Sequence, residues 1–115
     1  MPLAPVLASV HVRVRMTEPD DIIDMPALRA HIDALDAELI ALFARRRDLI
    51  DRAAQIKAAQ SLPARIDWRV DEVVQNARRN AAAAGLDEDL FADIWRRLVE
   101  AAIAQEDRHL KGDRQ

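Results

Sequence analysis

The sequence contains no cysteine, only two glycines and few aromatic residues. Without cysteine, the 115-residue chain forms no disulfide, no thiolate zinc site and no cysteine nucleophile. Two glycines, Gly85 and Gly112, are too few for a glycine-rich phosphate loop or a dinucleotide-binding fingerprint. A sandwich or barrel needs many tight turns, so the scarcity of glycine argues against these folds as well.

The net charge and the hydropathy argue against two kinds of partner, nucleic acid and a membrane. The 17 Lys and Arg residues face 20 Asp and Glu residues, so the net charge is −3 and no general attraction to nucleic acid is expected. No stretch reaches the roughly 18 uninterrupted apolar residues of a membrane span. The apolar residues 2–10 lack the charged segment that begins a signal peptide. We expect one cytoplasmic domain without a membrane partner.

Residues 1–25 differ in pattern from the rest of the chain. Apolar residues alternate with polar ones from Val10 to Met16, a strand-like pattern without a partner strand, and several prolines interrupt the segment. We predict a flexible extension, or sequence upstream of a start at Met16 or Met25. An ordered arm packed on the domain is the alternative.

A helical pattern begins at Pro26 and runs to about residue 110. Asp24 is placed to cap the first helix, which has no Gly or Pro until Pro63 and is therefore about 35 residues, or roughly 50 Å, long. Its apolar residues recur every three or four positions. A chain this small cannot cover both ends of such a rod, so the stripe predicts a partner, most simply a second copy. The stripe comprises Leu28, Ile32, Leu35, Leu39, Leu42, Leu49, Ala53 and Ile56.

Two further helices follow, which makes the fold class all-α: a three-helix chain with one long N-terminal helix. The second helix is predicted over about 64–84, with Gly85 just after its end. Asp87 then caps a third helix that ends near 109–110, and residues 111–115 form a tail. The inward positions of these two helices are Ile66, Val70, Val73, Val74, Ala77, Ala81, Ala84, Leu90, Phe91, Ile94, Trp95, Leu98, Ala102 and Ile103.

Several charged residues fall on the apolar stripes. Lys57 follows Arg46 by eleven residues, which places both within about 20° of one helix face and roughly 16 Å apart. Arg29 lies about 100° round the same helix and would more easily serve a neighbouring subunit. Glu106 lies on the apolar face of the third helix. Singly, such residues are solvated, snorkelling or paired with one another. Together they predict a pocket for a small anion, because Arg and Lys bind carboxylates.

The residues LRAHIDALDAELIALFARRRDLIDRAAQIK, followed by P-x-R-x-x-x-R and GLDEDLFADIWRRLVEAAIAQE, resemble the all-helical, AroQ-type chorismate mutases over roughly 26–110. The resemblance implies an isomerase of the shikimate pathway and aromatic amino acid biosynthesis. It implies an intertwined homodimer with two active sites, each completed by one arginine of the other subunit. The rearrangement is unimolecular, so no metal and no organic cofactor is expected.

The resemblance also assigns roles to individual residues. The partner subunit's Arg29 and this subunit's Arg46 would bind the two carboxylates of chorismate. Lys57 would hydrogen-bond a carboxylate and the ether oxygen. Arg69 matches an arginine early in the family's second helix, and Ala102 stands where some members have a serine.

Two positions depart from the family pattern. Val70 replaces a glutamate that takes the ring hydroxyl, and Glu106 replaces a glutamine that donates to the ether oxygen. Conversion of chorismate to prephenate needs no nucleophile or general base, only selection of the folded diaxial substrate and stabilisation of charge on that oxygen. Lys57 can always donate, whereas Glu106 donates only when protonated. Turnover is therefore predicted to rise as the pH falls.

Val70 leaves a second activity open. Relatives of the same fold eliminate pyruvate from isochorismate to give salicylate, and they also lack that glutamate, although they keep a glutamine where Glu106 stands. A third possibility is a non-catalytic helical dimer, favoured if Arg46 and Lys57 are ion-paired without a cavity. Trp68 and Trp95 are expected at helix contacts, while His31 and His109 lack metal-ligand spacing.

Overall fold

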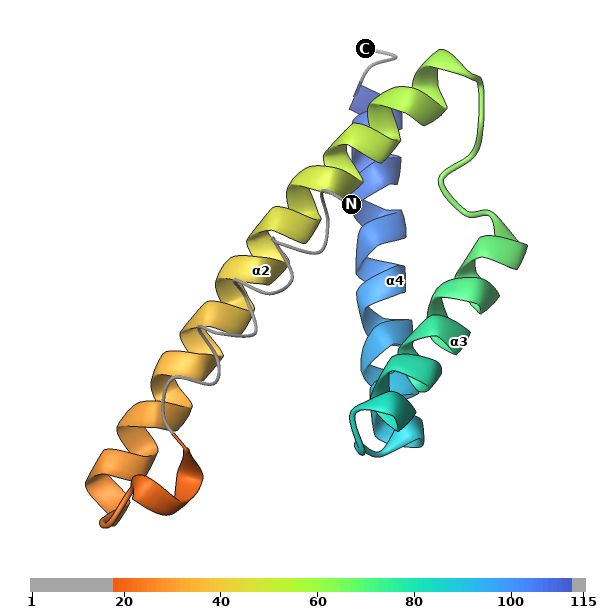
Figure 1. Ribbon diagram of the computed structural model, residues 1–115. Helices are drawn as coiled ribbons and strands as arrows, with labels where there is room; N and C mark the ends of the chain where they lie inside the picture. Colours follow the sequence, from red (N-terminus) through yellow and green to blue (C-terminus); the bar gives the residue numbers. More distant parts are fainter. Residues whose placement is uncertain (1–17, 113–115) are drawn as a thin grey trace, which may run out of the picture. The chain divides into compact units, whose positions relative to one another are not determined.

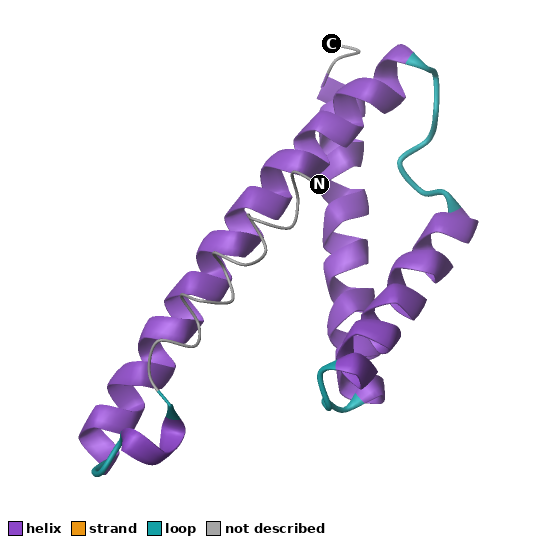
Figure 2. Ribbon diagram, in the orientation of Figure 1, coloured by secondary structure: helices purple, strands orange, loops and turns teal. Residues whose placement is uncertain are grey.

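The computed structural model describes residues 18–112, which contain helices and no strand (Figures 1 and 2). A short 3₁₀ helix, η1 (Pro19–Asp21), precedes three α-helices, α2 (Met25–Ala59), α3 (Asp67–Ala83) and α4 (Glu88–Gly112). The all-α prediction with one long first helix is confirmed. The strand-like pattern of residues 10–16 lies outside the described residues. The chain divides into two units, Met1–Ala44 and Arg45–Gln115, and α2 contributes to both.

Helix α2 begins where the sequence predicts. Asp24 caps it, because its Oδ1 accepts a hydrogen bond from the Ala27 amide at 2.8 Å. Pro26 lies in the first turn, where its missing N–H is not needed. The helix then runs unbroken for 35 residues. The helix ends at Ala59, and Ser61, two residues later, has a positive φ of 57°.

Helix α3 starts three residues later than expected, at Asp67. Residues 60–66 form the connection from α2, and Ala64 is buried there rather than helical. The end of α3 agrees with the prediction. Gly85 has a φ of 74°, and the amides of Gly85 and Leu86 donate to the carbonyls of Ala82 and Ala81, a Schellman motif.

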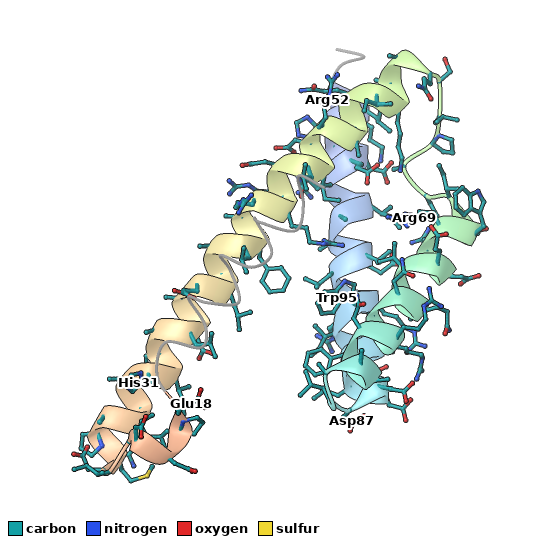
Figure 3. The ribbon with its side chains drawn as sticks, viewed as in Figure 1. Glu18, His31, Arg52, Arg69, Asp87 and Trp95 are labelled. Atoms are coloured by element: carbon teal, nitrogen blue, oxygen red, sulfur yellow. The ribbon has the colours of Figure 1, made fainter. Side chains whose placement is uncertain are left out.

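Asp87, which Figure 3 labels, caps helix α4. The Asp87 Oδ1 atom accepts hydrogen bonds from the amides of Asp89 at 2.9 Å and Leu90 at 3.1 Å. The helix extends to Gly112. It therefore ends later than residues 109–110 and includes the first two residues of the predicted tail.

The core of the C-terminal unit lies between α3 and α4, which pack against each other. Most of its buried residues are small: Ala77 and Ala81 on α3, and Ala92 and Ala102 on α4. A cluster of Ala64, Val99 and Ile103 joins the α2–α3 connection to this core. Two residues that were expected to be buried, Ala84 and Leu90, are exposed, because they flank the turn where α3 ends and α4 begins.

Helix α2 leaves most of its apolar stripe uncovered in the single chain. Ala54 is its one buried residue. Leu49 exposes 71 % of its surface and Ile32 exposes 49 %. The single chain therefore leaves much of this helix exposed, and the partner expected to cover it stays a prediction. No helix among the described residues is long and apolar enough to cross a membrane.

The positive φ of Ser61 generates a stability prediction. The amides of Ser61 and Leu62 donate to the carbonyls of Ala58 and Lys57, so the left-handed conformation is needed to end α2. Glycine adopts it without strain, although glycine also raises the entropy of the unfolded chain. We expect Ser61→Gly to raise the free energy of unfolding by about 0.5–1 kcal/mol, measured by urea denaturation. Ser61→Ala is the control, and equal stability of the two variants would contradict the prediction.

Candidate functional site

The C-terminal unit contains a cavity of about 380 Å³. Its lining comes from the second half of α2, the α2–α3 connection, α3 and α4. Six of the seven site residues predicted from the sequence line it: Arg46, Lys57, Arg69, Val70, Ala102 and Glu106. The seventh, Arg29, lies in the N-terminal unit with an exposed side chain and is not among the lining residues.

Lys57 and Glu106 form an ion pair in this cavity. Lys57 Nζ lies 2.6 Å from Glu106 Oε1, and the two side chains expose 18 % and 6 % of their surfaces. Lys57 Nζ also donates a hydrogen bond of 2.6 Å to the Ala64 carbonyl in the α2–α3 connection. Glu106 Oε1 accepts no hydrogen bond of good geometry within the described chain. The ammonium keeps one donor for a ligand, and the carboxyl group keeps unused hydrogen-bonding capacity.

Two arginines bring further positive charge to the same cavity. Arg46 is half-buried on α2, and burial together with the charge of Arg69 lowers the pKa of its guanidinium. Arg69 extends from the first turn of α3 (Figure 3) and pairs with Glu72 at 2.6 Å while its side chain stays 55 % exposed. Within residues 18–112, Arg46 has no ion-pair or hydrogen-bond partner. A bound anion would relieve the repulsion between the two guanidinium groups.

The other ten lining residues are all apolar. Val70 and Ala102, predicted from the sequence, are joined by eight residues that were not predicted as part of the site, among them Ile66, Val73 and Trp68. The expectation for Trp68 is wrong, because its side chain is not packed at a helix contact but lines the cavity with 68 % exposure. Trp95 is half-buried and lies beside Phe91, with ring centroids 6.4 Å apart. Helical periodicity could have identified Val73, whereas nothing in the pattern distinguished Trp68.

Next to the cavity, a polar cluster that sequence reasoning missed links α2 to α4. Asp51 Oδ1 accepts hydrogen bonds from Gln105 Nε2 at 2.5 Å and contacts His109 Nε2 at 2.7 Å. Gln105 Nε2 also donates to the Arg47 carbonyl at 3.0 Å. The hydrogen bond from Gln105, followed by His109 and the charge of Arg47, lowers the pKa of Asp51. His109 therefore has a carboxylate partner, although its side chain stays 45 % exposed.

The arrangement suits an apolar molecule that carries carboxylates. Arginine and lysine supply charge-assisted hydrogen bonds to carboxylate oxygens, while the apolar wall can hold a ring. The cavity lining contains no Ser, Thr or Cys nucleophile, so the site offers binding and charge stabilisation. No group of metal-ligating side chains occurs among the described residues.

Comparisons with known proteins agree with this geometry. The family model described as chorismate mutase type II matches residues 28–107. A T-protein of Haemophilus influenzae is 37 % identical over 81 residues, which cover 70 % of this chain and 22 % of that protein. A 4-amino-4-deoxychorismate mutase of Streptomyces venezuelae is 35 % identical over 92 residues, 80 % of this chain and 86 % of that protein. The chain thus spans about a fifth of the T-protein's length. No solved structure matches significantly.

The lowered pKa of Asp51 generates a prediction about acid stability. A carboxyl group whose pKa is lower in the folded chain stabilises the fold above its unfolded value of roughly 3.9, and this contribution is lost as the pH falls through the folded pKa. We expect the thermal midpoint of Asp51→Asn to fall less than that of the wild type between about pH 5 and pH 2. Midpoints measured by circular dichroism test this, and parallel curves for the two proteins would argue against it.

Proposed function

Because this chain belongs to the chorismate mutase type II family, we propose that its cavity binds chorismate and catalyses rearrangement to prephenate. The observation that carries the proposal is the convergence of Arg46, Lys57 and Arg69 on one largely apolar cavity with a buried Glu106. Such a lining binds a dianion around a non-polar ring. The reaction needs no chemistry beyond what these side chains can supply.

Each polar group has a role in the proposed mechanism. Arg46 and Arg69 hold substrate carboxylates, so that the enolpyruvyl side chain lies over the ring in a near-attack conformation. In the transition state the breaking C–O bond places negative charge on the ether oxygen. Lys57 donates its remaining hydrogen bond there, and Glu106 donates a second when it is protonated. As a carboxylate, Glu106 instead holds the Lys57 ammonium at 2.6 Å and repels the developing charge.

The ring substituent is the least constrained part of the substrate. Val70 and Val73 line the cavity, and Glu106 is the only carboxyl group among the lining residues. An apolar wall gives a ring hydroxyl no specific partner, so 4-amino-4-deoxychorismate is a second candidate, favoured by the Streptomyces relative's name. Isochorismate, with elimination of pyruvate, is the third. The cationic groups are equally able to bind all three compounds.

An assay of the purified protein on the three compounds, at pH 5 and pH 7.5 with product identification, tests this proposal. Prephenate as the main product supports the mutase. Faster rearrangement of the 4-amino compound would assign the second candidate, and salicylate with pyruvate would assign the lyase. No turnover of any compound would overturn enzymatic function and leave a non-catalytic helical dimer. The cytoplasmic location and the role in aromatic amino acid biosynthesis stay predictions.

The active assembly is proposed to be a homodimer. Leu35, Leu39 and Leu42 each expose 40–45 % of their surface, and a second copy of α2 is the simplest cover for this stripe. Arg29 is exposed on the same helix and does not line the cavity of its own chain. The partner subunit's Arg29 would then add a cation to the site of this subunit.

Protonation of Glu106 generates a prediction about pH. We expect turnover to rise as the pH is lowered, because only the protonated carboxyl group donates to the ether oxygen, and the assay range is about pH 8 to pH 5. Glu106→Gln donates at every pH and is expected to flatten the profile. Steady-state kinetics across this range measure both effects. A flat wild-type profile would remove Glu106 from this role.

Mixed dimers test the origin of Arg29. Arg29→Ala and Arg46→Ala are each expected to lose about 100-fold or more in kcat/KM. When the two inactive variants are unfolded and refolded together, one site of each mixed dimer regains both arginines. Random assortment then restores about a quarter of wild-type activity. Arg52→Ala is the matched control, because Arg52 is exposed on α2 and, within the described part of the chain, bonds only to Gln55. No recovery on mixing would contradict the shared site.

A further inference from the structure

Two polar links join the second half of α2 to α4, and they use neighbouring residues of α4. One is the ion pair of Lys57 with Glu106, inside the cavity. The other is Asp51, whose Oδ1 accepts a hydrogen bond from Gln105 and contacts His109, outside the cavity lining.

Apolar packing between α2 and α4 is slight. The one buried residue of α2 is Ala54, whereas the bulky buried residues of α4, Val99 and Ile103, belong to the cluster with Ala64. Small side chains interlock less than large ones, because ridges and grooves between helices are built by bulky side chains. The rotational setting of α4 relative to this part of α2 therefore depends on directional polar contacts.

Rotation of α4 matters for the site because the buried Glu106 side chain lines the cavity. A side chain ends about 5–6 Å from the helix axis, so a rotation of about 20° moves its tip by roughly 2 Å. Such a shift would break the 2.6 Å contact between Lys57 and Glu106. Gln105 precedes Glu106 by one residue, so a bond that holds Gln105 also holds the direction of Glu106.

We propose that Gln105 and Asp51 are positioning residues, which hold α4 so that the Glu106 carboxyl group faces Lys57 and the reacting atoms. The proposal rests on the proposed function. Gln105 fastens two points of α2 with one amide, the Asp51 carboxylate and the Arg47 carbonyl. His109 reinforces the same carboxylate from one turn further along α4.

The test is a double-mutant cycle between Gln105 and Glu106. Gln105→Met keeps the length of the side chain but cannot donate a hydrogen bond. At the acidic end of the assay range, where the proposed mechanism uses the protonated carboxyl group, we expect it to lower kcat by roughly 10- to 100-fold with a smaller effect on KM. In the Glu106→Ala background the same change is expected to have no further effect, because no carboxyl group remains to be positioned. A loss of equal size in both backgrounds, or no loss, would overturn the proposal.

Matched changes on α2 keep the proposal testable if Gln105→Met does not fold. Asp51→Ala is expected to reproduce its loss, whereas Asp51→Asn keeps an acceptor oxygen and retains most activity. Asp48→Ala is the control, because among residues 18–112 Asp48 pairs only with Arg47 on its own helix. Equal activity of Asp51→Ala and Asp48→Ala would count against positioning.

A crystal structure of the Gln105→Met or Asp51→Ala variant gives a readout that is independent of activity. We expect the distance between Lys57 Nζ and Glu106 Oε1 to open beyond hydrogen-bonding range, while Asp48→Ala keeps it near 2.6 Å. An unchanged distance in both variants would overturn the positioning role. Absence of turnover in the wild type would instead overturn the proposed function and leave this structural outcome to be decided separately.

Discussion

The site depends on keeping the charged groups Lys57 and Glu106 where they are largely removed from water. Removing one partner of such a buried pair leaves an uncompensated charge, which typically costs about 3–5 kcal/mol. Here the described chain does not use all the hydrogen-bonding capacity of the pair. The ammonium keeps one donor, and Glu106 Oε1 accepts no hydrogen bond of good geometry within the described chain. A pair retained in this state suits ligand binding better than stability.

The cost of these charges is offset by the way the helices are arranged around them. Small residues bring α3 and α4 close together, while the Ala64 carbonyl of the α2–α3 connection binds the ammonium. Lys57 and Arg69 each pair with a glutamate, whereas Arg46 lines the same cavity of about 380 Å³ without an acidic partner among residues 18–112. The uncovered stripe on α2 shows that a single chain leaves considerable apolar surface exposed, which favours association with a second copy.

Much of the fold and of the candidate site was predictable from individual residues. Asp24, Gly85 and Asp87 marked helix ends, because capping chemistry acts within one turn and is visible in the sequence. The eleven-residue spacing of Arg46 and Lys57 placed both on one face, and both line the cavity. The predictions that failed concern tertiary packing or helix boundaries. Trp68 is exposed at the cavity, and α3 starts at Asp67.

The sequence by itself determined the three helices and most of their ends, and helical periodicity placed Arg46, Lys57 and Glu106 on apolar faces. The family resemblance added Arg69, Val70 and Ala102, and all six residues line one cavity. Only the tertiary structure decided which groups touch. The bond between Asp51 and Gln105 joins residues 54 positions apart, and the contact of Lys57 with Glu106 depends on how α2 meets α4. Such contacts are set by the rotation and crossing of packed helices, which no local pattern encodes.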